Sequence, residues 1–264
     1  MRNILCVTLI ALLGGCTSTS VTEKYQDKRN DIINVKDKVI EFETGNVLIG
    51  SVSRLYMSNK CLLIADHKSV DKQIHIFNKN DFSYLTSIGN FGEGPEEITV
   101  MGCLAIDEAH HQLYVSDHAK QKIFSYDMDS VMVDSLYKPQ VKTAMNETLF
   151  PSEYQYINDT LSIAVLIKPT STSTFNQFLG RWNMNTGEMI PMKYTHPDIQ
   201  KKRITFAASE KAGIYVECYT RHDLMTICSL DGELLYNIYG PDWDGGNGNK
   251  LQSFGTVMIG NDKI

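Results

Sequence analysis

Residues Leu85–Asp117, LTSIGNFGEGPEEITVMGCLAIDEAHHQLYVSD, contain the pattern that decides the fold. The segment begins with a short strand-like run and continues through the glycine-rich stretch GNFGEGPEE. It ends with the apolar runs MGCLAI and QLYVSD, which a polar turn separates. Short apolar runs bounded by Gly, Pro, Asp and Asn are typical of strands joined by turns. The stretch therefore predicts the last strand of one β-unit, a crossing loop, and the first two strands of the next unit.

The same unit recurs about every 50 residues along the chain. The expected second strands end at Asp66, at Asp117, near residue 165 and at Glu217, and Asp231-Gly232 is a hairpin signal in the last unit. Almost no segment keeps the helical i, i+3, i+4, i+7 spacing. This period predicts an all-β protein, a β-propeller of four-stranded antiparallel blades. A β-sandwich with coincidental spacing is the alternative.

Three segments carry a resemblance to a known family: Leu48-Ile49-Gly50, Ile76-Phe77 and above all IGNFGEGPE at Ile88–Glu96. Together they resemble the TolB-like six-bladed β-propeller lipoproteins of Bacteroidetes, in which such a loop joins the first and second blades. The resemblance covers residues 36 to about 130 and continues more weakly to the end of the chain. It implies six blades and export, and it implies no particular activity, because most members have none assigned.

Compared with a six-bladed member, the chain is about 100 residues short, or two blades. We expect about four blades plus a fragment, Phe254–Ile264, that begins a fifth. Since open blade edges expose unpaired backbone groups, we interpret the sequence as a truncated or interrupted reading frame. The alternative is a complete four-bladed ring, in which Val39–Phe42 pairs with the unit at residues 203–240.

The first sixteen residues predict a lipoprotein signal peptide. Ile4–Leu13 is an apolar run too short to span a bilayer, and Leu13-Gly14-Gly15-Cys16 resembles a lipobox, in which the cysteine is acylated. An ordinary secretory signal is the alternative. We expect residues 1–16 to be the signal peptide, 17–35 a polar tether and 36–264 a partial propeller domain. Lipidated Cys16 would anchor the protein to the membrane of the cell envelope; by resemblance to lipoprotein sorting, this is the outer membrane.

Charge and cysteine content exclude other classes. The formal net charge is −6, and the basic residues are scattered except for Lys201-Lys202-Arg203, which we interpret as a solvated turn. Without a concentrated basic face, nucleic acid is not the expected partner. The four cysteines of the domain are expected to be buried free thiols, because none has metal-site spacing; they are Cys61, Cys103, Cys218 and Cys228. Cys218 with Cys228 is the one pair that a disulfide could join.

Two conspicuous loops have structural interpretations. The loop with Gly92, Gly94, Pro95 and Glu96 lacks the lysine and helix of a phosphate-binding loop, so we expect an inter-blade crossing in which Glu96 caps backbone donors. The run Asp107–His111 suggests a metal site. However, adjacent histidines on an extended chain point to opposite sides, so a polar hairpin turn is expected.

The most site-like feature left is the glycine-rich loop at residues 242–248 with the tyrosine before it. An aromatic ring beside carboxylates can stack on a sugar ring and accept its hydroxyl hydrogens, so the candidate binding residues are Tyr239, Asp242, Trp243 and Asp244. Another blade crossing is the alternative, and we favour it. The sequence contains no catalytic motif, so no catalytic residue, metal or cofactor is assigned.

These observations favour a membrane-anchored binding or scaffold module for a glycan or an envelope protein, without catalysis. The alternative is a metal-assisted propeller hydrolase or lyase that acts on sugar lactones or polysaccharide. In that case Asp, Glu or His side chains from several blades would hold a metal in the axial channel.

Overall fold

The computed structural model describes residues 21–29, 34–200, 202–248, 254–260 and 263–264. Their strands form four antiparallel sheets in chain order. Blade 1 consists of β2 (Ser53–Met57), β3 (Cys61–Asp66), β4 (Lys72–Asn78) and β5 (Tyr84–Asn90). Blade 2 consists of β6 (Met101–Asp107), β7 (Gln112–Asp117), β8 (Lys122–Asp127) and β9 (Gln140–Ala144). Blade 3 consists of β10 (Phe150–Asn158), β11 (Leu161–Pro169), β12 (Phe175–Trp182) and β13 (Met189–Pro191). Blade 4 consists of β14 (Ile204–Ser209), β15 (Ile214–Tyr219), β16 (Leu224–Ser229) and β17 (Leu234–Tyr239).

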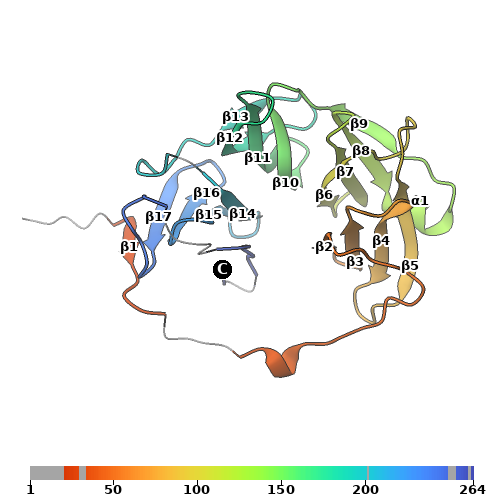
Figure 1. Ribbon diagram of the computed structural model, residues 1–264, viewed down its shortest axis with the longest axis horizontal. Helices are drawn as coiled ribbons and strands as arrows, with labels where there is room; N and C mark the ends of the chain where they lie inside the picture. Colours follow the sequence, from red (N-terminus) through yellow and green to blue (C-terminus); the bar gives the residue numbers. More distant parts are fainter. Residues whose placement is uncertain (1–20, 30–33, 201, 249–253, 261–262) are drawn as a thin grey trace, which may run out of the picture.

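The four blades stand side by side in an arc, and the first strand of each blade faces the centre (Figure 1). The four antiparallel strands of each blade therefore belong to one sequence unit, as the period predicted. The β-propeller prediction is confirmed.

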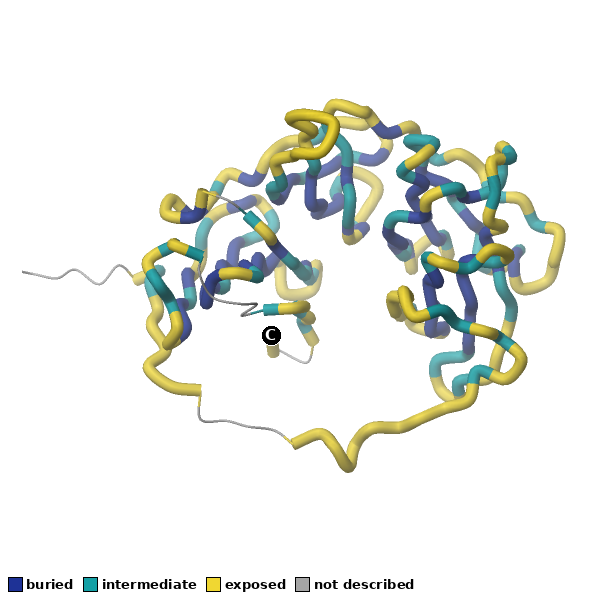
Figure 2. The backbone as a smooth tube through the Cα atoms, viewed as in Figure 1, coloured by how far each residue is buried: buried dark blue, intermediate teal, exposed yellow. Residues whose placement is uncertain are grey.

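The core lies between the blades, where the two faces of neighbouring sheets meet. Leu63 and Ile76 of blade 1 pack with Leu113 and Phe124 of blade 2 in one buried cluster. Corresponding clusters join blade 2 to blade 3 and blade 3 to blade 4. Because side chains of a strand alternate between faces, each blade buries apolar residues on both sides, and the strands form the buried interior in Figure 2.

Flanking segments cover the outer faces of the first and last blades. Phe42 stacks on Phe82 at 4.5 Å and meets Phe77 edge-on at 6.0 Å. On blade 4, Phe254, Val257 and Ile259 pack against the cluster that contains Val216 and Cys218. The pairing suggested for Val39–Phe42 is therefore wrong. This segment has no strand partner, because its aromatic ring packs on blade 1 instead.

The edge of blade 4 is extended by a different segment, β1 (Glu23–Tyr25), which pairs in parallel with β17. Tyr25 stacks on Tyr239 with ring centroids 4.6 Å apart. This strand lies inside residues 17–35, where we expected only a polar tether. From β1 the chain continues to blade 1 through η1 (Lys36–Lys38) (Figure 1).

One helix, α1 (Met128–Val133), follows β8. In the described residues no helix has the length and apolar character needed to cross a bilayer. The predicted signal peptide and Cys16 lie outside the described residues. In the fragment at Phe254–Ile264, the described residues form no strand beyond an isolated bridge between Gly260 and Lys263.

The four domain cysteines are buried and free, as expected. The disulfide suggested between Cys218 and Cys228 is wrong for a geometric reason. Cys218 packs with Val216 on the outer face of the blade 4 sheet, whereas Cys228 packs with Tyr215 and Tyr219 on the face toward blade 3. Two thiols on opposite faces of one sheet cannot be bridged.

Candidate functional site

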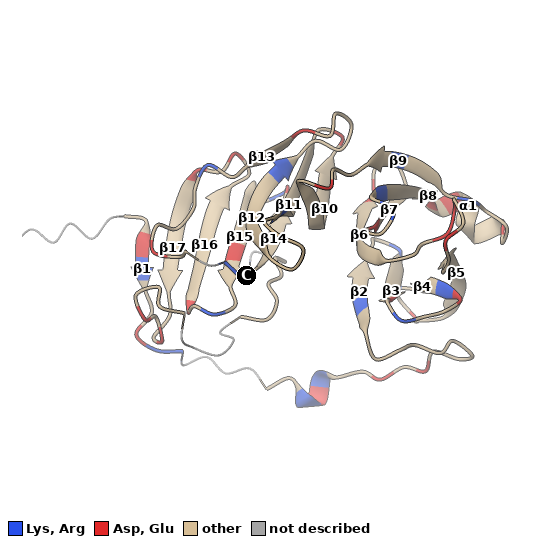
Figure 3. Cartoon of the chain, turned by 45° about the horizontal axis from the view of Figure 1, so that its top comes forward, with Lys and Arg blue, Asp and Glu red and all other residues tan. Residues whose placement is uncertain are grey.

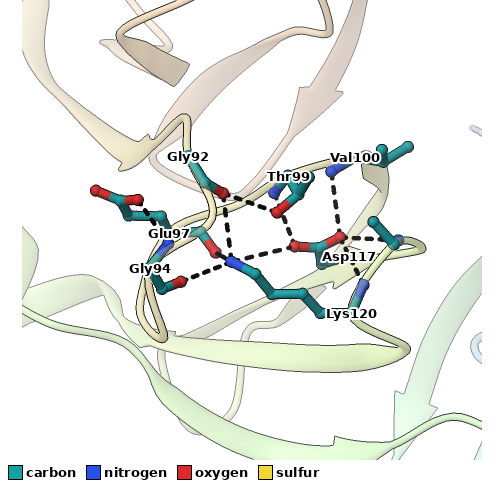
Figure 4. A network of polar contacts seen from close by, with 8 residues as sticks. Gly92, Gly94, Glu97, Thr99, Val100, Asp117 and Lys120 are labelled. Carbon is teal, nitrogen blue, oxygen red and sulfur yellow. Dashed lines mark hydrogen bonds and ion pairs between the residues drawn. The ribbon is translucent and has the colours of Figure 1, made fainter.

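The glycine-rich crossing between blades 1 and 2 is filled by the protein's own side chains (Figure 4). Lys120 Nζ donates to the carbonyl oxygens of Gly92, Gly94 and Glu97, at 3.3, 2.6 and 2.5 Å. The buried carboxylate of Asp117 accepts from the backbone N–H groups of Thr99 and Val100. These contacts fasten the crossing to the blade it enters.

Within this crossing, Glu97 has the capping role that we expected of Glu96. The carboxylate of Glu97 accepts a hydrogen bond of 2.8 Å from the Gly94 N–H. Glu96 instead points outward and pairs with Lys138 at 2.7 Å. The reason is the turn that begins at Gly94, because the Glu97 N–H donates to the Gly94 carbonyl oxygen at 3.1 Å and so places the Glu97 side chain beside the Gly94 N–H.

The Asp107–His111 run forms the turn between β6 and β7, and its histidines diverge. His110 Nδ1 donates to Asp107 and His111 Nδ1 donates to Asp129, both at 2.8 Å. Asp159, from the equivalent turn of blade 3, lies close to the first pair. Asp107, His110 and Asp159 are the one group in the described residues with three metal-ligating side chains in mutual reach.

At the centre of the arc, the innermost strands line a cavity of about 300 Å³. Arg54 of β2 and Glu153 of β10 pair across it at 2.6 Å. Among the described lining residues, Glu153 is the single carboxylate, and no histidine accompanies it. In the described part of the chain, the lining of this cavity thus offers one carboxylate ligand, that of Glu153.

A larger cavity, of about 870 Å³, opens between blades 3 and 4, and we call it the blade 3–4 pocket. It lies on the face that carries the turn between the second and third strands of each blade. The pocket is lined by Phe175, Asn176, Gln177, Phe178, Thr195, His196, Pro197, Ile199, Gln200, Lys202, Arg203, Arg221, His222, Gly246, Asn247 and Gly248. Its size is typical of small-ligand sites.

The chain enters β14 along the floor of this pocket, through Lys202 and Arg203. Lys202 is largely buried and pairs with Glu217 of β15 at 3.4 Å, and the Arg203 guanidinium lies 5.3 Å from the centre of the Phe175 ring. Burial raises the pKa of Glu217, and the nearby Lys202 opposes that rise. The solvated turn expected at Lys201-Lys202-Arg203 is therefore wrong for Lys202. The sequence could not reveal the burial of Lys202, because its partner Glu217 is fifteen residues away in the chain.

The glycine-rich loop lines the same pocket, but through Gly246, Asn247 and Gly248. Trp243 lies behind the wall, with its ring 5.0 Å from Tyr239 and 5.6 Å from His196. The backbone N–H of Asp242 donates to the buried Asp223, and Asp244 lies 3.9 Å from His222. The four predicted binding residues thus support the pocket wall and do not line it; they are Tyr239, Asp242, Trp243 and Asp244.

Two buried histidines form part of the wall. Burial lowers the pKa of His196 and of His222, so both rings are neutral at neutral pH. His196 Nδ1 accepts from the Asp198 N–H, so its Nε2 carries the proton and donates to the Tyr239 hydroxyl at 2.9 Å. That hydroxyl donates in turn to Glu23 of β1. A hydrogen-bond chain therefore runs from the N-terminal strand to the pocket.

A third cavity, of about 410 Å³, lies between blades 1 and 2 on the opposite face. Apolar side chains such as Leu63, Leu113 and Met128 provide most of its exposed surface, although polar side chains such as Asp107 and Asp129 also line it. It offers fewer polar groups to orient a ligand than the blade 3–4 pocket does.

A family model described as a six-bladed β-propeller, DUF5128, matches residues 17–216. The chain belongs to this family. A comparison with curated protein sequences finds no match. Figure 3 shows charged residues of both signs spread over the blades of this DUF5128 chain.

Among solved structures, the chain is similar to a Bacteroides fragilis protein described as exported. The two share 15% identity over 83% of this chain and 59% of the other, with a TM-score of 0.52. It is also similar to an auxiliary nutrient binding protein from Bacteroides ovatus, with 12% identity over 72% of this chain and 47% of the other, and a TM-score of 0.46. The DUF5128 chain thus spans 59% and 47% of the lengths of these two proteins. At this identity the likeness to the first shows the fold alone.

Proposed function

We propose that this protein is a non-catalytic binding module of the cell envelope that holds a glycan in the blade 3–4 pocket. Acylated Cys16 would anchor it to the outer membrane. The observation that carries the proposal is the lining of the pocket, in which aromatic rings, side-chain amides and cationic groups converge on one cavity.

This combination matches the chemistry of a saccharide. The apolar face of a sugar ring packs on an aromatic ring, which Phe175 supplies. Its hydroxyl groups need paired donors and acceptors, which the amides of Asn176, Gln200 and Asn247 provide. Phe175 and Asn176 lie at the start of β12, Gln200 lies before β14 and Asn247 lies in the loop after β17, so these groups reach the pocket from three segments of the chain.

The test is calorimetric titration and glycan-array binding with the chain in which Cys16 is replaced by serine and residues 1–15 are removed. We expect saturable glycan binding that Phe175→Ala weakens about tenfold, the loss of one stacking contact. Phe91→Ala is the matched control, since the two rings are 43% and 45% exposed and Phe91 lies on the crossing between blades 1 and 2. Absence of binding to every glycan, or equal weakening by both variants, would refute the proposal.

The second candidate, a metal-assisted hydrolase or lyase, is favoured by the Asp107, His110 and Asp159 group. Two carboxylates and an imidazole suit Zn²⁺ or Mn²⁺. This group lies on the face opposite to the blade 3–4 pocket. Metal-dependent turnover of a polysaccharide that is lost in Asp159→Asn would replace the binding proposal with this one.

A further inference from the structure

We propose that the glycan held in the blade 3–4 pocket is acidic, with carboxylate groups on its sugar rings, and that Arg203 and Arg221 bind them. This inference rests on the proposed function and names the chemical class of its ligand.

The first argument is the state of the two guanidinium groups. Arg203 leads into β14 and Arg221 lies in the turn between β15 and β16, so they reach the pocket from different segments. Neither forms an ion pair with another residue in the described part of the chain, and both are exposed. Arginine stays charged at all relevant pH values, so the pocket holds two positive charges with which no described carboxylate pairs.

Lys202, the third cationic residue of the lining, does form an ion pair within the protein. Lys202 is 3.4 Å from the buried carboxylate of Glu217, and its side chain is only 9% exposed. The positive charge of Lys202 is therefore paired with a carboxylate inside the protein. This leaves recognition of a ligand anion to the two arginines.

The second argument is the absence of acid from the lining. The whole chain has 31 acidic and 25 basic residues, yet no carboxylate is among the described residues that line this pocket. Of the acids near the wall, Glu217 is held by Lys202 and Asp244 lies 3.9 Å from His222, whereas the exposed Asp198 follows the lining residue Pro197 but is not part of the lining. A local excess of positive charge in an acidic protein attracts an anion and steers it to the site.

The third argument is geometric and favours a carboxylate. The Arg203 guanidinium is positioned over the Phe175 ring, a contact that limits its freedom before any ligand arrives. A planar guanidinium presents paired N–H donors that match the two oxygens of a carboxylate. With the amides of Asn176 and Gln200 beside it, the pocket can bind the charged and hydroxyl groups of one uronate ring together.

The experiment uses the soluble chain described above and oligosaccharides of galacturonate, mannuronate and glucuronate. Each is compared with its carboxyl-reduced counterpart, in which the same sugar chain has lost its charge. Calorimetry in low and high salt measures both affinities. We expect at least one uronate oligosaccharide to bind about tenfold or more tightly than its reduced form, and high salt to remove most of this difference.

Variants assign the effect to the two arginines. Arg203→Gln and Arg221→Gln are each expected to lower uronate affinity about tenfold while leaving affinity for the reduced oligosaccharide unchanged. Arg181→Gln is the control, because Arg181 is half-buried on β12 outside the pocket and pairs with Asp231. An unchanged urea midpoint confirms that each variant is folded.

The outcomes separate this inference from the proposed function. The inference is overturned if the reduced and acidic forms bind equally, or if sulfated oligosaccharides or DNA bind more tightly than every uronate. In either case the proposal that the pocket binds a ligand still stands. Binding of no saccharide at all overturns both.

Discussion

The Oδ2 atom of Asp117 accepts a hydrogen bond of 2.8 Å from the backbone N–H of Thr99. This contact joins the end of β7 to the crossing that leads into β6. Blade 1 repeats it, since Asp66 at the end of β3 accepts from the Gly50 N–H at 2.7 Å. An aspartate at the end of the second strand thus fixes the entry of the chain into each of the first two blades.

Replacement of Asp117 should therefore destabilise the protein strongly. Its buried carboxylate also accepts from the backbone N–H groups of Ala119 and Lys120, so Asp117→Ala leaves several donors unpaired. We expect a loss of about 3 kcal/mol or more in the free energy of unfolding, measured by urea denaturation. Asp231→Ala is the control, because Asp231 is exposed and its pairing with Arg181 is loose, so a loss below about 0.5 kcal/mol is expected. Similar losses in both variants would contradict this role.

Lys120 is expected to matter far more than another lysine of the same region. Its side chain is 15% exposed and its ammonium group binds three carbonyl oxygens, whereas Lys138 is 71% exposed and pairs with Glu96. Lys120→Met should cost about 2–4 kcal/mol of unfolding free energy, since charged hydrogen bonds are lost and buried carbonyls remain. Lys138→Met should cost less than about 1 kcal/mol. Thermal denaturation at matched pH measures both, and an inverted order would exclude Lys120 as the anchor of the crossing.

Stability should fall on mild acidification. Burial lowers the pKa of five histidines, His67, His75, His118, His196 and His222. The unfolded chain, with a histidine pKa of about 6.5, then binds protons that the folded chain does not, so the free energy of unfolding decreases as the pH drops below about 6.5. Asp107 raises the pKa of His110, which acts in the opposite sense, but that side chain is exposed.

The measurement is the urea midpoint at pH 7.5, 6.5 and 5.5. We expect a steady decrease, and a smaller one in His75→Gln, which removes a buried ring whose Nε2 has no partner in the described structure. A midpoint that stays constant or rises toward pH 5.5 would show that these rings are not held neutral.

The four domain thiols should resist modification in the folded state. Burial raises the pKa of Cys103 and of Cys218 to about 12, so little thiolate is present at neutral pH. In a chain lacking Cys6 and Cys16, we expect no thiol to react with a disulfide reagent under native conditions and four to react in denaturant. Two reactive thiols in denaturant without reductant would instead indicate a disulfide.

Much of the fold could be predicted because its signals are local. Each blade forms from about 50 consecutive residues, so alternation and turn residues reveal its strands without knowledge of the other blades. The helix α1 was missed, because MDSVMV is too short to show a helical period and contains two valines; its N-cap, Asp127, which accepts from the Ser130 N–H, was the available signal.

The sequence by itself determined the repeat, the second strand of each blade to within a few residues, the crossing loop and the burial of the four cysteines. Only the tertiary structure decided that Glu97 rather than Glu96 caps the crossing, that Glu23–Tyr25 extends blade 4, and that Lys202 is buried against Glu217. It also brought Phe175, Arg203 and Arg221 to one pocket. The physical reason is range: strand periodicity acts between residues two apart, whereas a pocket depends on the packing of blades whose side chains are separated by tens of residues in the chain.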